Sequence, residues 1–197
     1  MSYYFDKDTS VTSKEVITKA EIGNTLFTFV TDNNVFSKRG LDFGTRTLLE
    51  NINDINGDVL DFGCGYGPIG IFLKKKFNVN VDMIDINMRA INLSLKNASI
   101  NKVNVNIFES DIYNNITKKY DYIITNPPIR VGKKILYEIL IGSKKYLKNN
   151  GHLIFVINKS QGAKSVLNDM KNYFNVKIIK KNKGFYVIDC QNCWLID

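Results

Sequence analysis

The chain has 197 residues, of which 44% are hydrophobic and 23% charged, so it is long enough to bury a substantial core within one domain. It has no apolar run near the roughly 18 residues that span a bilayer, and its start lacks the basic and apolar segments of a signal peptide, which predicts a cytoplasmic protein without a membrane partner. The net charge of +8 suits a nucleic-acid partner, although a Lys-rich and Asn-rich composition of the kind AT-rich genomes encode would give a similar charge without function.

We expect a single domain, 1–197, in which residues 1–55 form an N-terminal β/loop extension. Residues 1–20 are polar and are expected to be extended or partly ordered. The aromatic and β-branched run at 25–30 predicts a strand, and a helix is expected from about 44 to 52. We expect this extension to contribute to the rim of the functional site.

From residue 58 onward, β-branched runs alternate with helical patterns. Alternation of this kind predicts an α/β fold with a Rossmann-like, doubly wound and mainly parallel sheet over 56–197. In such sheets ligands bind beyond the carboxyl ends of the strands. The expected strands are 58–61, 79–84, 103–108, 120–125, 152–158, 176–180 and 185–190. One helix is expected to begin near Pro68, and further helices are expected at 87–98, 135–147 and 163–173. Asn87 is the expected N-cap of the helix at 87–98.

A glycine-rich turn lies between the first strand of this pattern and its first helix. Gly63, Gly65 and Gly67 permit a tight turn and a close approach of the backbone to a ligand. The spacing of the last two with Gly70 formally matches the dinucleotide fingerprint, which is a weak signal on its own. Asp61 at the mouth of the turn disfavours a pyrophosphate and favours the cationic methionyl end of S-adenosylmethionine, bound directly or through water.

Two further carboxylates follow the next two expected strands. Asp85 follows Gly63 at about the spacing, roughly 20 residues, expected for an acceptor of ribose hydroxyls. Asp111 is placed to accept a hydrogen bond from an adenine amino group, with Ile112 packing on the ring. Each acid alone fits a helix cap or a solvated turn equally well. Three acids at successive strand ends beside a glycine turn predict a binding site for S-adenosylmethionine.

A polar amide and two prolines end the expected strand at 120–125. The side-chain oxygen of Asn126 and the carbonyl of Pro127 can accept the two N–H groups of an exocyclic amine, which aims its lone pair at a methyl carbon. Pro127 and Pro128 fix the backbone so that the two acceptors converge. A proline-stiffened turn is also common without function. Together with the cofactor pattern, however, it indicates an S-adenosylmethionine-dependent N-methyltransferase.

The chain resembles class I methyltransferases, and among them the small-subunit ribosomal RNA guanine-N2 methyltransferases, over nearly its whole length from about residue 25. The resemblance rests on FSKRGLDFGT (36–45), DFGCGYG (61–67), DIN (85–87), Asp111, NPPIR (126–130) and GK (132–133). It implies a seven-stranded methyltransferase sheet with an antiparallel last strand. It also implies the exocyclic N2 of a guanine in 16S-type ribosomal RNA, in the assembled or assembling small ribosomal subunit, as the acceptor.

The chain departs from most amino methyltransferases after the two prolines, where Ile129 replaces an aromatic that usually stacks on the acceptor ring. Substrate binding is therefore expected from Pro128 and Ile129 with additional stacking from Phe36, for which a buried loop anchor is the alternative reading. Arg130 and Lys133, beside the same turn, are candidates to hold a substrate phosphate, with surface solvation as the alternative.

Two other classes of function fit part of the pattern. Protein-glutamine and adenine-N6 methyltransferases use the same Asn-Pro-Pro turn, but they typically place an aromatic where this chain has Ile129. A non-catalytic RNA-binding assembly factor would keep the fold without needing Asp61, Asp85 and Asn126 together.

The three cysteines do not form a disulfide framework in a chain of this size. Cys190 and Cys193 have the spacing of a redox or metal pair. Only Cys64 and the single His152 remain as further ligands of these types, so we expect no metal.

Overall fold

The computed structural model describes residues 14–32, 40–128 and 131–193, and its main feature is a seven-stranded sheet. The strand order is β5-β4-β3-β6-β7-β9-β8, in which β9 runs antiparallel to both of its neighbours and the other paired strands are parallel. The strands are β3 (Asp58–Phe62), β4 (Asn80–Asp85), β5 (Asn106–Glu109), β6 (Tyr120–Thr125), β7 (Leu147–Asn158), β8 (Asn175–Asn182) and β9 (Phe185–Gln191). The doubly wound, mainly parallel sheet predicted from the alternating pattern is confirmed.

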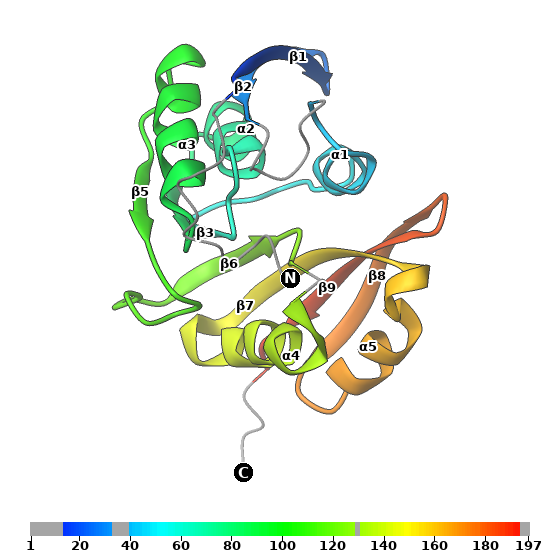
Figure 1. Ribbon diagram of the computed structural model, residues 1–197. Coiled ribbons are helices and arrows are strands. Elements are labelled where there is room, and N and C mark those ends of the chain that lie inside the picture. Colours follow the sequence, from blue (N-terminus) through cyan, green and yellow to red (C-terminus); the bar gives the residue numbers. More distant parts are fainter. Residues whose placement is uncertain (1–13, 33–39, 129–130, 194–197) are drawn as a thin grey trace.

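Helices cover both faces of this sheet, which explains why its central strands are buried on both sides. Figure 1 shows one layer formed by α1 (Phe43–Glu50), α2 (Pro68–Phe77) and α3 (Met88–Ile100), and the other formed by α4 (Lys133–Gly142) and α5 (Ala163–Met170). Each layer encloses its own cluster of buried apolar side chains. No helix in the described ranges combines the length and the apolar character needed to cross a membrane.

Several boundaries differ from the sequence prediction; for example, α5 ends at Met170 and not at 173. The strand expected at 103–108 begins only at Asn106. The helix expected over 135–147 ends at Gly142, is followed by a 3-10 turn at Ser143–Tyr146, and gives way to β7 at Leu147. There the chain pairs with Tyr120 of β6, so an extra sheet contact replaces the last helical turn. Helix α3, in contrast, begins as predicted, with the Asn87 side chain accepting a hydrogen bond from the Arg89 amide.

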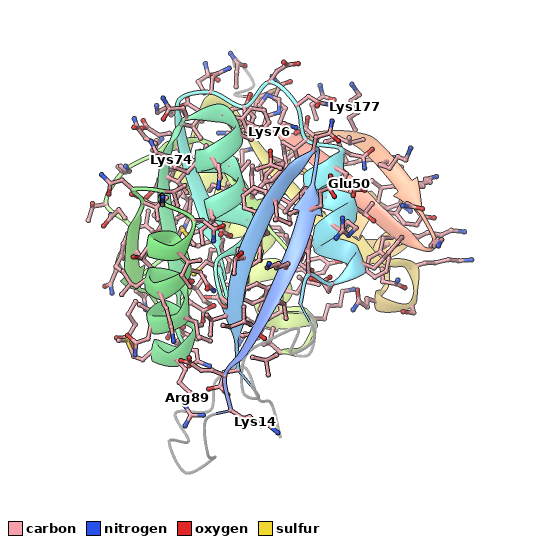
Figure 2. All side chains as sticks on the ribbon, turned by 90° about the horizontal axis from the view of Figure 1, so that it is seen from above. Lys14, Glu50, Lys74, Lys76, Arg89 and Lys177 are labelled. Carbon is pink, nitrogen blue, oxygen red and sulfur yellow. The ribbon has the colours of Figure 1, made fainter. Side chains whose placement is uncertain are left out.

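A β-hairpin precedes the main sheet and lies across the first helical layer. It pairs β1 (Val16–Ile22) with β2 (Thr25–Thr31) through a two-residue turn in which Gly23 and Asn24 both have positive φ. Phe27 and Phe29 of β2 are fully buried, and each such ring stabilises the fold by about 1.5–3 kcal/mol. Figure 2 shows the hairpin running over α1, α2 and α3. The extended conformation expected up to residue 20 is present at 16–20, where it forms most of strand β1, a sheet element that the sequence pattern had not indicated.

Two asparagines complete the outer edge of β2, one within α3 and the other at its C-cap. The Asn97 side chain accepts from the Val30 amide at 2.7 Å and donates to the Val30 carbonyl at 2.9 Å. Asn101 makes the same pair of contacts with Thr28, at 3.2 and 2.8 Å. A strand edge otherwise presents unpaired amides and carbonyls, so these side chains fix the hairpin to α3 as another strand would.

Candidate active site

The glycine turn between β3 and α2 leaves its backbone open to a ligand. Gly63, Gly65 and Gly67 have φ values of 68°, 58° and 94°, which L side chains rarely adopt. A Cβ built on Gly63 or Gly65 would meet no atom within 4 Å, so both positions face open space. At Gly70 a Cβ would lie 2.6 Å from Met83 Sδ, which shows that this glycine serves the close packing of α2 on β4.

The turn is held in place by the neighbouring elements. The Cys64 amide donates to the Ile84 carbonyl at 2.8 Å, and the Gly65 amide donates to Asp85 Oδ2 at 2.9 Å. Ser94 of α3 donates to the Gly65 carbonyl at 2.8 Å. These contacts fix the shape of the turn before any ligand arrives, which lowers the entropic cost of binding.

Asp61 lies fully buried directly beneath this turn. Its Oδ2 accepts a hydrogen bond from the Gly70 amide at 2.8 Å, whereas its Oδ1 is buried without a partner in the described part of the chain. Burial raises the pKa of Asp61 to about 7, with the nearby Asp85 charge adding to the effect. A buried carboxylate oxygen without a partner is costly, and a cationic or hydroxyl-bearing ligand over the turn would relieve that cost directly or through water.

Asp85 at the end of β4 is already engaged by the backbone. Its Oδ2 accepts from Gly65 and its Oδ1 accepts from the Asn87 amide at 2.9 Å, while burial raises its pKa. Each carboxylate oxygen can accept more than one hydrogen bond, so both retain capacity for a ligand hydroxyl. The backbone contacts orient the carboxylate for that task.

The loop after β5 carries Asp111, which is exposed, and Ile112, which is half-buried. Ile112 has a φ of 51°, and a β-branched residue in this region costs on the order of 1–3 kcal/mol. Ser110 sustains the conformation by donating to the Ile112 carbonyl at 3.1 Å and accepting from the Asn115 amide at 3.2 Å. Backbone strain held in this way is typical of ligand-binding loops.

The turn after β6 is tied to the glycine turn by one hydrogen bond. Thr125 Oγ1 donates to the Phe62 carbonyl at 2.8 Å, and these residues immediately precede Asn126 and Gly63. Pro127 is buried and Pro128 half-buried. The two segments that the sequence singled out therefore lie beside each other at the carboxyl edge of the sheet.

The Asn126 side chain is oriented by two residues of the N-terminal segment. Its Nδ2 donates to Thr45 Oγ1 at 2.9 Å and approaches Asp42 Oδ1 at 3.4 Å. Because an ionised carboxylate only accepts hydrogen bonds, the amide nitrogen must be the atom that faces Asp42. The amide oxygen lies on the other branch of this planar group, so it can accept a hydrogen bond from another molecule.

Sequence reasoning had assigned no role to Asp42 and Thr45. Asp42 is the N-cap of α1, and its Oδ1 also accepts from the Thr45 amide at 3.0 Å. An Asp just before a helical segment signals an N-cap, but only the fold shows that this helix start lies against Asn126.

The structure brings most of the predicted residues together. The glycine turn and the residues at the ends of β4, β5 and β6 share one edge of the sheet, because these strands are neighbours and parallel (Figure 1). Asp61, Gly63, Gly65, Gly67, Asp85, Asp111, Ile112, Asn126, Pro127 and Pro128 lie there. Phe36, Ile129 and Arg130 fall outside the described residues.

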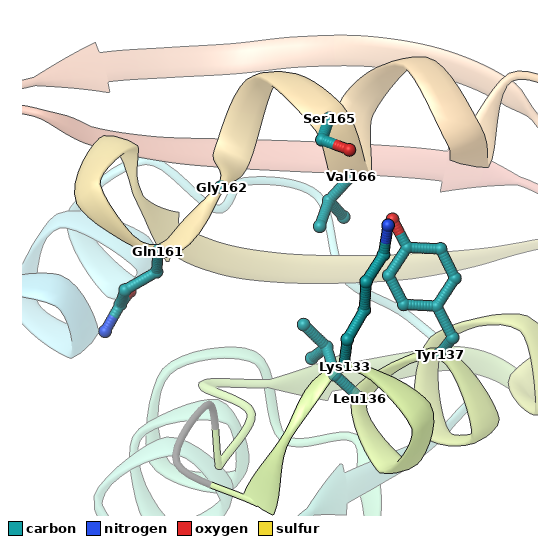
Figure 3. Close-up of a pocket in the computed structure, with 7 residues that line it drawn as sticks. All are labelled: Lys133, Leu136, Tyr137, Gln161, Gly162, Ser165 and Val166. Atoms are coloured by element: carbon teal, nitrogen blue, oxygen red, sulfur yellow. The ribbon is translucent and has the colours of Figure 1, made fainter.

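Lys133 borders a hollow of about 340 Å³ between α4 and α5, shown in Figure 3. Its side chain is 72% exposed, its Nζ lies 4.0 Å from Asp169 Oδ2 and 5.1 Å from the centroid of the Tyr137 ring. Tyr137 donates to the same Asp169 oxygen. An ion pair this long and exposed contributes little stability, so Lys133 can turn toward an anionic partner at little cost.

The cysteines take structural positions. Cys64 is buried, its Sγ lies 3.5 Å from Ser94 Oγ, and burial raises its pKa well above the usual range, which disfavours a nucleophilic thiolate. Cys190 is buried in β9. Within the described ranges no group of three His, Cys, Asp or Glu side chains is arranged to hold a metal ion.

Comparison with known proteins gives a consistent family. The model of the family described as "Methyltransferase small domain" matches residues 26–189. The chain is 40% identical over 193 residues to YbxB, an uncharacterised protein of Bacillus subtilis, covering 94% of this chain and 96% of that one. It is 36% identical over 162 residues to ribosomal RNA small subunit methyltransferase C of Psychromonas ingrahamii, covering 79% of this chain and 46% of the relative.

The fold is also found among solved structures. The Thermus thermophilus 16S rRNA N2 G1207 methyltransferase, in complex with AdoMet and guanosine, superposes with a TM-score of 0.82 at 22% identity. The match covers 94% of this chain and 53% of that one. The chain thus spans about half the length of the ribosomal RNA methyltransferases that it matches.

Proposed function

Because the chain belongs to the methyltransferase small domain family, we propose that it transfers a methyl group from S-adenosylmethionine to the exocyclic N2 of a guanine in small-subunit ribosomal RNA. The observation that carries this proposal is the Asn126 amide, whose nitrogen is held by Thr45 and Asp42 so that its oxygen is left as an acceptor. Asn126 directly follows Thr125, whose hydrogen bond to the Phe62 carbonyl joins the turn after β6 to the glycine turn.

The cofactor residues have complementary roles. S-adenosylmethionine supplies an electrophilic methyl group on a sulfonium. Asp61, with its unpartnered Oδ1, balances the cationic methionyl end directly or through water. Asp85 accepts from the ribose hydroxyls, Asp111 accepts from the adenine amino group, and Ile112 packs on the adenine ring.

The acceptor side works by orientation. The lone pair of guanine N2 is delocalised into the ring, so no strong base is needed before attack. Asn126 Oδ1 and the Pro127 carbonyl accept the two N–H groups and aim the lone pair at the methyl carbon. The nitrogen that receives the methyl group from the sulfonium would become cationic, and these two acceptors would stabilise it until one proton passes to water.

The named relatives support the choice of acceptor. The Thermus thermophilus structure contains guanosine with AdoMet, and the Psychromonas ingrahamii relative is named for small-subunit ribosomal RNA. A net charge of +8 agrees with an RNA partner. Transfer of a tritiated methyl group should be measured in parallel on small ribosomal subunits, naked ribosomal RNA, tRNA and release factor. We expect label in small-subunit RNA, whereas label confined to release factor would indicate protein-glutamine methylation.

Cofactor affinity is expected to depend on pH through Asp61. Its pKa in the folded protein is raised to about 7, and only the ionised form balances a cationic ligand. Affinity for S-adenosylmethionine should therefore rise with pH and level off above about 7, with a slope approaching tenfold per pH unit below that point. Calorimetry on the wild type and on Asp61→Asn separates the contribution of Asp61 to this pH dependence. Titration of the cofactor's own groups affects both proteins equally.

The same carboxyl group should affect the stability of the cofactor-free protein in the opposite direction. The folded state retains a proton that the unfolded state, with a pKa near 3.8, has already released. The contribution of the Asp61 carboxyl group to the free energy of unfolding is therefore present at low pH and is lost as pH rises through about 7. If Asp61→Asn shows the same pH dependence of cofactor binding as the wild type, the methionyl end is held elsewhere.

RNA binding is expected to be strongly salt-dependent and to weaken in Lys133→Ala. Losing one phosphate contact should lower the slope of log affinity against log salt by about 1. Arg130→Ala, outside the described residues, is expected to act in the same direction. Lys177→Ala is the matched control, because Figure 2 places Lys177 with Lys74 and Lys76 at the end of the molecule opposite Arg89. If the slope of log affinity against log salt is the same for Lys133→Ala, Lys177→Ala and the wild type, Lys133 makes no phosphate contact and is only a solvent-exposed surface residue.

A further inference from the structure

An aromatic pair lies at the carboxyl edge of the sheet without a role in the site described so far. Phe43, the first residue of α1, is 37% exposed, and its ring centroid lies 5.6 Å from that of Phe185 at an interplanar angle of 54°. Lys183 Nζ lies 5.4 Å from the centroid of the Phe43 ring. We call Phe43, Phe185 and Lys183 the Phe43 platform.

The platform packs on the same turn that orients Asn126. A Cβ built on Gly44 would lie 2.8 Å from Phe185 Cε1 and 3.1 Å from Asp42 Oδ1, so the Phe185 ring and the Asp42 carboxylate both border Gly44 at the α1 N-terminus. Asp42 Oδ1 is in turn 3.4 Å from Asn126 Nδ2. The aromatic pair therefore borders the helix start that supplies Asp42, one of the two residues that orient the Asn126 amide.

Strand pairing places the platform at the same edge. Phe185 begins β9 and pairs with Asn158 at the end of β7, the strand beside β6. The Lys159 amide donates to the Gly184 carbonyl at 2.7 Å, which joins the β8–β9 turn to the segment after β7. Lys159, Lys181 and Lys183 are all exposed, and the nearby acid Asp42 is half-buried and engaged with Asn126 and Thr45. The solvent-facing charge around the platform is thus positive.

We propose that the Phe43 platform stacks an unpaired nucleotide that neighbours the acceptor guanine in the RNA substrate, while Lys183 meets its phosphate. This inference rests on the proposed function. An exocyclic nitrogen buried in a base stack cannot reach Asn126, so the acceptor must be extruded or single-stranded. A neighbouring base then loses a stacking partner, and aromatic rings beside cations bind such bases whatever their sequence.

The test measures stacking directly, without turnover. A short single-stranded oligoribonucleotide carries one guanosine with 2-aminopurine beside it, and binding is followed by fluorescence quenching and by anisotropy. Phe43→Leu and Phe185→Leu keep an apolar side chain and remove the ring. Each is expected to weaken RNA binding by about fivefold to a hundredfold and to reduce the quenching, because stacking on one aromatic ring supplies an affinity of that order. Lys183→Gln is expected to weaken binding and to lower its salt dependence.

Matched controls separate this effect from loss of a surface ring or charge. Tyr173 is 43% exposed and lies just before β8, at the opposite edge of the sheet, so Tyr173→Leu should bind RNA as the wild type does. Lys177→Gln is the control for charge. Calorimetry with S-adenosylmethionine confirms that each variant is folded, since cofactor affinity should match the wild type throughout.

Three outcomes would overturn the platform or separate it from the proposed function. Wild-type quenching and affinity in both Phe variants would make the aromatic pair a packing contact only. Normal RNA binding with methylation lost only on assembled subunits would assign the surface to a ribosomal protein. Loss of quenching in the variants, in a protein that forms no N2-methylguanosine on any RNA, would keep the platform and reject the proposed function.

Discussion

Replacing Asn126 by Ala is expected to lower the rate of methyl transfer by about 10²–10³ while leaving cofactor affinity close to that of the wild type. Removing one preorganised partner at a reacting centre typically has an effect of this size. The Asn126 side chain forms its hydrogen bonds with Thr45 and Asp42, and the Thr125–Phe62 bond to the glycine turn does not involve it, so the fold of the cofactor site should survive. Single-turnover rates with saturating cofactor, together with calorimetry, measure both quantities.

Two further variants sharpen this result. Asn126→Asp should also be impaired, because it keeps an acceptor but places a second carboxylate near Asp42 and beside the sulfonium. Thr45→Val removes one of the two groups that orient the amide and should reduce the rate less than Asn126→Ala does. Full activity of Asn126→Ala would reject the mechanism, and an unaffected Thr45→Val would show that Asp42 alone sets the orientation.

Replacing Asp85 by Ala is expected to weaken cofactor binding by about tenfold to a hundredfold. A lost hydrogen bond to a charged group costs roughly 1.5–3 kcal/mol, and Asp85 is placed to accept from the ribose hydroxyls. Part of the loss should come from the glycine turn, because Asp85 also accepts from the Gly65 amide at 2.9 Å. The dissociation constant for S-adenosylmethionine measures the sum of the two effects.

The control is another acid of the same strand. Asp82 lies at the amino half of β4, where it accepts from the Tyr120 hydroxyl at 2.8 Å, far along the strand from the ligand edge. Asp82→Asn should therefore lower stability with little change in cofactor affinity of the folded protein. A dissociation constant unchanged in Asp85→Ala would mean that the ribose acceptor is a different group.

Much of the fold could be predicted from local patterns. The alternation of β-branched runs with helical segments after residue 58 gave the class of sheet, and the Tyr120–Thr125 strand has the predicted bounds. The sequence pattern did not indicate those elements whose structure depends on tertiary contacts. β1 has buried side chains only at Ala20 and Ile22, so its sequence carries little periodicity, and its pairing with β2 determines its structure. The division into a 1–55 extension and a 56–197 core stays a prediction.

The candidate site divides in the same way. Asp61, the glycines, Asp85 and Asn126 were found because each stands at a strand end, which the sequence pattern marks. Asp42 and Thr45 were missed as parts of the site because they act from a helix start remote in sequence, and Asn97 because its role depends on the β2 edge. The roles of Phe36, Ile129 and Arg130 stay predictions.

The proposal of guanine-N2 methylation is tested most directly by the product. Small ribosomal subunits lacking native modification should be incubated with the protein and S-adenosylmethionine, digested to nucleosides and analysed by mass spectrometry, with Asn126→Ala in parallel. We expect N2-methylguanosine to appear with the wild type and to be nearly absent with the variant. Methylation found only on adenine or on protein glutamine would contradict the account.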